Sequence, residues 1–300
     1  MLKRYYLADY EKIINASINY TLENSVINII QELSEQVGAP GYVKTPHFTN
    51  NIHNKDNRVY QNEILKFETT HKLKSEGIDI SIDLIRKLLN KITVTTYNDL
   101  FPLLLDELNK FSSFSDEENS KLGKIIFSFV SETPFYSELY AKLFSELYIK
   151  YPFLKNELTN KICLFNQSIN EITYYNPDIN YDAFCKNNKE NTRRKSIAVF
   201  FVNLAKEKII EIDKVYDIII MIQDSITSKL NQDSAKEIID ELSEISGDMI
   251  LSGKDFINNG DRWKKIVLFV ETISKMKVKQ HKSLSNKAIF KHMDVIDAIK

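Results

Sequence analysis

A regular alternation of amphipathic segments and short polar stretches fills the chain from Gly77 to its last residue. Apolar residues recur every three or four positions within each segment, as in an α-helix, and no window shows the alternation typical of strands. The segments follow one another as five pairs with a period of roughly 40 residues, which is typical of stacked helical hairpins. Only 7 glycines and 6 prolines occur among 300 residues, so few tight turns interrupt these segments.

The repeat predicts an all-α fold: a HEAT-like α-solenoid of about five helical hairpins, with a helical N-terminal arm. A four-helix bundle with additional helices is the alternative. Asp116 and Asn191 are expected as N-caps, and Gly247 indicates an irregularity near the end of its helix. The ten helices are expected over residues 78–92, 96–111, 117–132, 134–151, 154–175, 190–209, 212–230, 233–251, 261–276 and 284–300.

A segment rich in Gly, Pro, Asn and His divides the chain ahead of this array. It covers residues 38–58 and breaks every helical pattern, as a flexible linker does. Residues 1–37 have helical periodicity and are expected to form a separate helical arm. Residues 59–76 connect the linker to the array, which is expected to be one domain over residues 77–300.

Net charge is close to zero, so no overall field attracts polyanions to this chain. The end of the chain differs, because residues 261–300 hold ten Lys and Arg against four Asp and Glu. Two isolated cysteines, Cys163 and Cys185, give no disulfide framework, which favours a reducing compartment. The first residues lack the apolar core of a signal peptide, and no apolar run approaches the length of a membrane span. We therefore expect a cytoplasmic protein without membrane contact.

The sequence carries no motif that points to catalysis. Its glycines form neither a dinucleotide fingerprint nor a phosphate-binding loop, and its five histidines lack the spacing of zinc ligands. His281 and His292 are expected to face solvent or RNA. Asp240, Glu241 and Glu244 have the spacing of a solvated helix face. We therefore expect no catalytic residue, metal or cofactor, and a non-enzymatic protein that binds partners along an extended surface.

Four stretches of the array, in order, resemble one known domain. Residues 88–93 end the first helix with two leucines and an Asn-Lys-Ile-Thr turn, and residues 132–141 place an acidic-Pro turn before an aromatic-Ser-x-x-Tyr-Ala stretch. Residues 193–209 open on two arginines and continue with an apolar face, and residues 290–297 place Phe, Asp and Val in a closing helix. These stretches are similar to the middle domain of eukaryotic translation initiation factor 4G, a five-repeat HEAT domain, and the resemblance extends over residues 77–300.

The resemblance implies a scaffold for translation initiation. The family's middle domain binds RNA and the DEAD-box helicase of initiation, and it holds the two helicase lobes in a half-open arrangement. A curved solenoid that clamps two mobile lobes favours their competent state. Contacts are expected near the turns at both ends of the array, and core packing is the alternative role for Phe200. The residues expected to bind the helicase are Asn90, Lys91, Thr93, Phe200, Asn286, Phe290 and Asp294.

Basic residues of the array are the candidates for non-specific mRNA binding through phosphates. They are Arg193, Arg194, Arg262, Lys264, Lys265, Lys277, Lys279 and Lys282. The same cations could meet an acidic lobe of a protein partner, or only face solvent. The basic end of the chain has no interleaved aromatic residues, so sequence-specific recognition is not expected there.

The stretch "NRVYQNEILKF" precedes the first helix of the array, and Tyr60 is the only tyrosine followed by a leucine five positions later. Members of the resembled family carry a Tyr-x-x-x-x-Leu-apolar peptide here, which binds the cap-binding initiation factor as a helix. Lys66 stands where the family has an apolar residue, but its methylene stem or Phe67 can cover the same surface. A helix packed on the chain's own first repeat is the alternative. The expected docking residues are Arg58, Tyr60, Ile64, Leu65, Lys66 and Phe67.

Two further functions stay open. Another middle-domain HEAT protein of RNA metabolism, acting in decay, splicing or a cap complex, would share the fold without using the Tyr60 peptide. A non-enzymatic helical interaction protein would use the solenoid without binding RNA. A short initiation scaffold of this composition suits a large DNA virus or a protist, and a viral protein would act in the host cytoplasm. In each case we expect a monomer within a larger complex.

Overall fold

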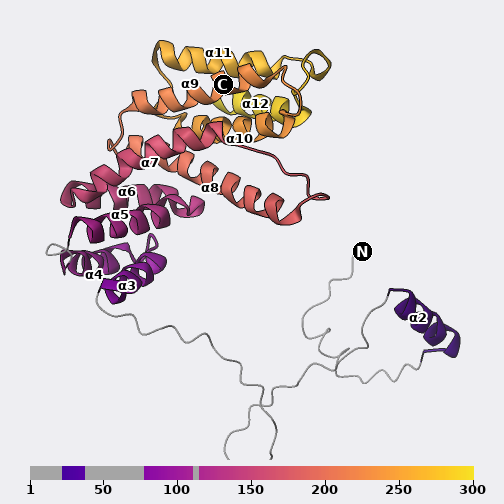
Figure 1. The fold of residues 1–300 in the computed structure, drawn as a ribbon, viewed down its shortest axis with the longest axis horizontal. Coiled ribbons are helices and arrows are strands. Elements are labelled where there is room, and N and C mark those ends of the chain that lie inside the picture. The colour runs from indigo at the N-terminus through magenta and orange to yellow at the C-terminus, as the bar shows by residue number, and fades with distance from the viewer. Residues whose placement is uncertain (1–21, 38–77, 111–114) are drawn as a thin grey trace, which may run out of the picture. The chain divides into compact units, whose positions relative to one another are not determined.

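A computed structural model of the chain describes residues 22–37, 78–110 and 115–300 (Figure 1). These residues form eleven α-helices and two short 3-10 helices, and no strand lies among them. The predicted all-α fold class is therefore confirmed. In the same ranges, no helix combines the length and the apolar character needed to cross a membrane.

The chain divides into two units, Met1–Thr69 and Thr70–Lys300. The helix described in the first unit is α2 (Asn24–Val37), an amphipathic helix within the predicted N-terminal arm. Its apolar residues recur at intervals of three and four, and Ile29 and Leu33 are exposed.

Ten α-helices follow one another in the described part of the second unit. Their bounds lie close to the predicted ones, except at the end of the fifth helix and the start of the sixth. They are α3 (Ile78–Lys91), α4 (Tyr97–Asn109), α5 (Asp116–Ser131), α6 (Ser137–Lys150), α7 (Phe153–Asn170), α8 (Tyr181–Lys206), α9 (Ile212–Lys229), α10 (Lys236–Gly253), α11 (Gly260–Ser274) and α12 (Asn286–Ile299), with the 3-10 helices η2 (Pro134–Tyr136) and η3 (Val278–Gln280).

Helices of the second unit stack in two layers, in the manner of a helical solenoid (Figure 1). In one layer α3, α5, α7, α9 and α11 each pack on the next, and in the other layer α6, α8, α10 and α12 do so. Consecutive helices also pack on each other, most extensively in the pairs α3 with α4, α5 with α6, α9 with α10, and α11 with α12. Each layer therefore covers the apolar side of the other.

The connection between α7 and α8 departs from the predicted hairpin. Helix α7 packs mainly on α5, whereas α8 packs mainly on α6 and α10. Helix α8 begins at Tyr181, where the Asn180 side chain accepts a hydrogen bond from the Ala183 amide at 3.0 Å. The predicted cap at Asn191 is wrong, because this residue is buried inside the helix. The polar first half of α8 lacks the apolar period of the other helices, which hid its start.

Two smaller predictions also need correction. Ser115 caps α5 in place of Asp116: its hydroxyl accepts from the Glu118 amide, and the Glu118 carboxylate accepts from the Ser115 amide. Gly247 lies within the continuous helix α10 and not at an irregularity. A Cβ atom at Gly247 would lie 2.5 Å from Cε of Lys291, so the glycine makes room for that lysine.

Aromatic rings fill the core where α5, α6 and α8 meet. The Phe127 ring lies edge-on to the rings of Phe144 and Phe200, with 5.8 Å between centroids in both pairs. All three side chains are buried. Rings in this arrangement add a specific geometric preference to the burial of their apolar area. The cluster therefore fixes α8 against α6.

Candidate docking groove and binding residues

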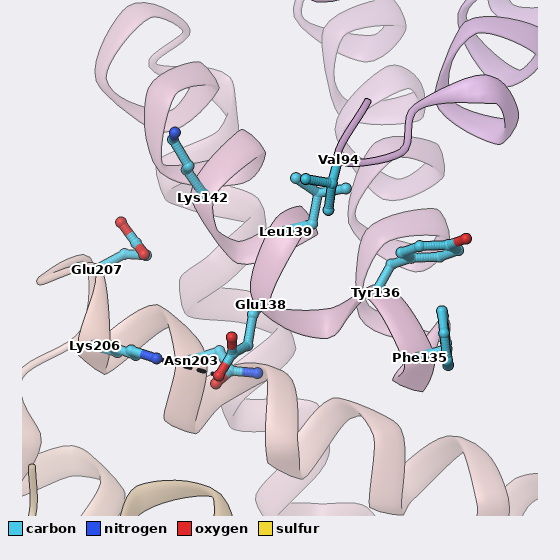
Figure 2. Close-up of a pocket in the computed structure, with 9 residues that line it drawn as sticks. All are labelled: Val94, Phe135, Tyr136, Glu138, Leu139, Lys142, Asn203, Lys206 and Glu207. Atoms are coloured by element: carbon cyan, nitrogen blue, oxygen red, sulfur yellow. Dashed lines mark hydrogen bonds and ion pairs between the residues drawn. The ribbon is translucent and has the colours of Figure 1, made fainter. Parts of the chain in front are cut away.

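A groove of about 500 Å³ lies where the α3–α4 turn, the start of α6 and the end of α8 meet (Figure 2). We call it the docking groove. Its lining residues are Val94, Phe135, Tyr136, Glu138, Leu139, Lys142, Asn203, Lys206 and Glu207.

The α3–α4 turn presents Val94 at a fixed tip. The Thr96 hydroxyl donates to the Lys91 carbonyl at 2.6 Å and accepts from the Thr93 amide at 2.9 Å. These bonds close the turn from within and leave 77% of Val94 exposed. Threonine side chains that bond to nearby backbone groups favour such turns.

The 3-10 helix η2 presents Phe135 in a similar way. The Thr133 hydroxyl donates to the Phe129 carbonyl at 3.1 Å, and Pro134 sets the backbone of the first turn. The Phe135 ring is 85% exposed and lies edge-on to Tyr136, with 4.8 Å between ring centroids. A large exposed ring on a rigid turn has the properties of an anchor for a protein partner.

Charged groups surround these apolar side chains. Lys206 Nζ lies 3.1 Å from the Glu138 carboxylate, and Lys142 is exposed beside them. Beneath this pair, the Asn203 amide donates to the Ser137 hydroxyl at 2.9 Å in a buried contact that joins α8 to α6. The docking groove thus combines two exposed apolar anchors with surrounding charges of both signs, as protein interfaces combine an apolar centre with a polar rim.

Three of the predicted helicase-binding residues lie next to the docking groove. Asn90 and Lys91 are exposed at the end of α3, and Thr93 is half-buried in the turn that carries Val94. Asn90 also lines an adjacent cavity of about 490 Å³ beside α5. The Tyr140 hydroxyl donates to the Leu89 carbonyl at 3.0 Å, which fastens the end of α3 to α6.

The remaining predicted helicase contacts lie elsewhere. Phe200 is fully buried in the ring cluster, so a direct partner contact is wrong for this residue, and its alternative role of core packing is the observed one. Asn286, Phe290 and Asp294 are exposed at intervals of four residues, hence on one side of α12, and 59% of Phe290 is exposed. Helices α3 and α12 lie toward opposite ends of the array (Figure 1).

Carboxylates of this chain hold half of the predicted RNA-binding cations. Each cation must leave its partner before it can bind a phosphate, which weakens its contribution to RNA affinity. The pairs are Arg193 with Glu132 and Glu190, Arg262 with Asp213 and Asp217, Lys264 with Asp261, and Lys282 with Asp233.

The other predicted cations differ in exposure. Arg194 is half-buried and donates to the Asn191 side chain at 2.7 Å, and burial lowers the pKa of its guanidinium. Lys265, Lys277 and Lys279 are exposed, and they form no ion pair with the part of the chain that the structure describes. These three lysines are therefore the predicted cations that are most available to a phosphate.

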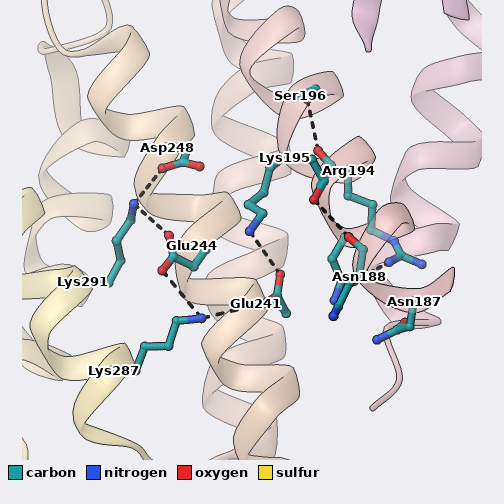
Figure 3. Close-up of polar contacts among 12 residues, drawn as sticks. Asn187, Asn188, Arg194, Lys195, Ser196, Glu241, Glu244, Asp248, Lys287 and Lys291 are labelled. Carbon is teal, nitrogen blue, oxygen red and sulfur yellow. Dashed lines mark hydrogen bonds and ion pairs between the residues drawn. The ribbon is translucent and has the colours of Figure 1, made fainter. Parts of the chain in front are cut away.

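Acidic residues of α10 form a charge ladder with lysines of α8 and α12 (Figure 3). Lys291 lies 2.7 Å from Asp248 and 3.1 Å from Glu244. Burial alone would lower the pKa of Lys291, but the hydrogen bonds and charges of Asp248 and Glu244 raise it. The other contacts of the ladder join Lys287 to Glu241 and Glu244, and Lys195 to Glu241.

This ladder corrects the prediction of a solvated acidic face. Glu241 and Glu244 bind lysines of neighbouring helices. Asp240 accepts a hydrogen bond from the Ser285 hydroxyl, and burial raises the pKa of its carboxyl group. The sequence could not distinguish the two arrangements, because the lysines come from helices that are distant along the chain.

His292 also differs from its prediction. It is buried rather than facing solvent or RNA, with Nδ1 2.8 Å from the Ala288 carbonyl and its ring against Phe269. Burial lowers the pKa of His292. Among residues 22–37, 78–110 and 115–300, no group of three or more His, Cys, Asp or Glu side chains is placed to hold a metal ion.

Sequence reasoning missed the two apolar anchors of the docking groove. Phe135 follows a proline in a short turn between two helices, and Val94 sits between threonines in another. A large apolar residue at such a turn has no core position to occupy, and that was the available signal.

The expected cap-binding-factor peptide lies outside the described residues, so its binding to the cap-binding factor stays a prediction. Its six residues are Arg58, Tyr60, Ile64, Leu65, Lys66 and Phe67.

Comparison with protein-family models gives no match for this sequence, and no curated protein matches it either.

Proposed function

We propose that this protein is a non-enzymatic scaffold of translation initiation. It binds the DEAD-box helicase through its solenoid, contacts mRNA without sequence preference, and joins the helicase to the cap-binding factor through the Tyr60 peptide. It acts in the cytoplasm, that of the host if the protein is viral, as a monomer within a larger complex. In this proposal the solenoid is a HEAT-like array of five hairpins.

The docking groove is the observation that carries the proposal. It exposes Phe135 and Val94 on rigid turns, next to Asn90 and Lys91 at the end of α3. A partner that covered both apolar side chains would bury a central patch surrounded by charges, which is the anatomy of a strong protein contact.

A second exposed set supports a partner with two lobes. Phe290 and its neighbours on α12 lie toward the other end of the array, so one partner can bind at both places only if it is large or divided. A helicase with two mobile lobes meets this requirement. Binding both lobes at once restricts their relative motion and increases the population of the active arrangement.

Two alternatives use the same surfaces. A middle-domain HEAT protein of RNA decay, splicing or a cap complex would bind a different helicase. A helical interaction protein would bind neither helicase nor RNA.

The experiment measures RNA-stimulated ATP hydrolysis by a purified DEAD-box initiation helicase, with and without the full chain. We expect stimulation by the unmodified protein, and half-maximal stimulation at about 30-fold higher concentration for Phe135→Ala, because loss of an interface anchor costs about 2 kcal/mol. Ile149→Ala is the matched control, since Ile149 is 77% exposed on α6 but does not line the docking groove. No binding and no stimulation by the unmodified protein would refute the proposal.

A further inference from the structure

We propose that the α7–α8 connection and the first half of α8 bind single-stranded RNA by stacking its bases on tyrosine rings. The connection exposes Tyr174, Tyr175 and Ile179, and Tyr181 opens the helix; Ile179 is 84% and Tyr181 65% exposed. Several large apolar side chains exposed within one short segment mark a surface that another molecule covers. The surface gives the proposed scaffold its RNA contact, and so rests on that function.

Hydrogen bonds hold the connection against α8. The Asn187 side chain donates to the Thr173 carbonyl at 2.9 Å, which fastens the start of the connection to the second turn of the helix. The Asp178 amide donates to the Asn176 side chain at 2.9 Å, and Asn180 caps α8. A backbone fixed in this way presents its rings to a ligand at a small cost in conformational entropy.

Lysines continue the surface along α8. Lys186 and Lys189 are exposed, lie three residues apart, and form no ion pair with the described residues of the chain. Asn187 directly follows Lys186, and its bond to the Thr173 carbonyl holds the backbone just before Tyr174 against this turn of α8. Aromatic rings beside available cations are the combination that binds single strands without sequence preference.

The composition of the surface favours RNA over a protein partner. Three of its four large exposed side chains are tyrosines, and the Tyr181 ring lies 6.4 Å from that of Phe184. Every base has a flat face that can stack on such rings. Asp178 and Asp182 are also exposed here, and their negative charges offset those of the two lysines. Phosphate contacts therefore contribute little to binding, and base stacking supplies most of the affinity.

Two phosphate contacts predict a weak dependence on salt. The logarithm of the binding constant should fall with the logarithm of salt concentration with a slope of about −1.4, from about −0.7 for each phosphate of a single strand. The Lys186→Gln, Lys189→Gln double variant should remove most of this slope while keeping measurable affinity.

The test follows fluorescence anisotropy of a labelled oligouridine on titration with the full chain. Replacing Tyr174, Tyr175 and Tyr181 by alanine should weaken binding by about 30-fold or more, because each stacked base contributes substantially. Replacing the same residues by phenylalanine keeps the rings and should keep the affinity. Phe135→Ala removes an exposed ring elsewhere and should leave RNA binding unchanged.

The outcomes separate the two proposals. Unchanged RNA affinity in the triple alanine variant overturns the stacking surface, as does an unmodified protein that does not bind oligouridine. A triple variant that loses helicase binding and keeps RNA binding also overturns it, because the surface would then dock a protein. Loss of RNA binding in a protein that never stimulates the helicase leaves the stacking surface standing and removes the proposed scaffold function.

Discussion

Replacing Gly247 by alanine should destabilise the protein, although alanine favours a helix more than glycine does. Gly247 lies inside α10, and a Cβ atom there would stand 2.5 Å from Cε and 3.3 Å from Cγ of Lys291. Lys291 must therefore move, and it then leaves its positions at 2.7 Å from Asp248 and 3.1 Å from Glu244. The variant thus tests whether the charge ladder stabilises the fold.

The size of the effect follows from two opposing terms. Alanine in a helix interior is favoured over glycine by about 1 kcal/mol. The side chain of Lys291 is only 16% exposed, and hydrogen bonds between charged groups contribute about 1.5–3 kcal/mol each. Losing one bond and weakening the other should cost roughly 3 kcal/mol, which leaves a net destabilisation of about 2 kcal/mol.

The effect of Gly247→Ala on stability should change sign in a Lys291→Ala background. In Lys291→Ala the obstructing side chain is absent, so Gly247→Ala should stabilise that variant by about 1 kcal/mol. Urea unfolding of the four proteins, followed by circular dichroism, completes the cycle and should give a coupling of about 3 kcal/mol. Stabilisation in the unmodified background would refute the reasoning. Equal destabilisation in both backgrounds would also refute it, since the contact with Val295 at 3.2 Å would then be the cause.

Three further predictions concern single residues and the N-terminal peptide. Phe200→Ala should lower the free energy of unfolding by about 3–5 kcal/mol, and a fully stable variant that loses only helicase binding would contradict its core position. Burial lowers the pKa of His292, so its contribution to stability is present above the pKa of the unfolded state and is lost as the pH falls toward the pKa of the folded state. Unfolding experiments across this pH range should show no such loss for His292→Gln. A pH profile equal to that of the unmodified protein would contradict this prediction. Tyr60→Ala with Leu65→Ala should abolish binding to a purified cap-binding factor, at a cost of about 2 kcal/mol or more, while helicase binding survives; unfolding of the variant would show that these residues belong to the core.

The sequence predicted the helices well because their apolar residues keep one period. Leu122 and Ile126, for example, are both buried four residues apart on α5. It failed at the start of α8, where Asn187 and Asn191 are buried polar residues that period alone assigns to a loop. Their burial depends on partners such as the Thr173 carbonyl, which local sequence does not reveal.

The candidate site was only partly predictable for a related reason. Asn90 and Lys91 could be placed at the end of a helix, and both are exposed there. The docking groove also needs Phe135 and Lys206, which come from distant parts of the chain and meet only when α8 packs on α6. Periodicity places a residue on a helix, but it does not say which other helices cover it. Phe200 was therefore expected to contact a partner, whereas it is buried in the core.

Binding of the full chain to each isolated lobe of the helicase, measured by calorimetry, tests the proposed scaffold most directly. The groove variant Phe135→Ala should lose affinity for one lobe, and Phe290→Ala on α12 should lose affinity for the other, because the two residues lie toward opposite ends of the array. Each variant should keep the lobe that the other loses. Two variants that weaken the same lobe, or an unmodified chain that binds neither lobe, would contradict the account.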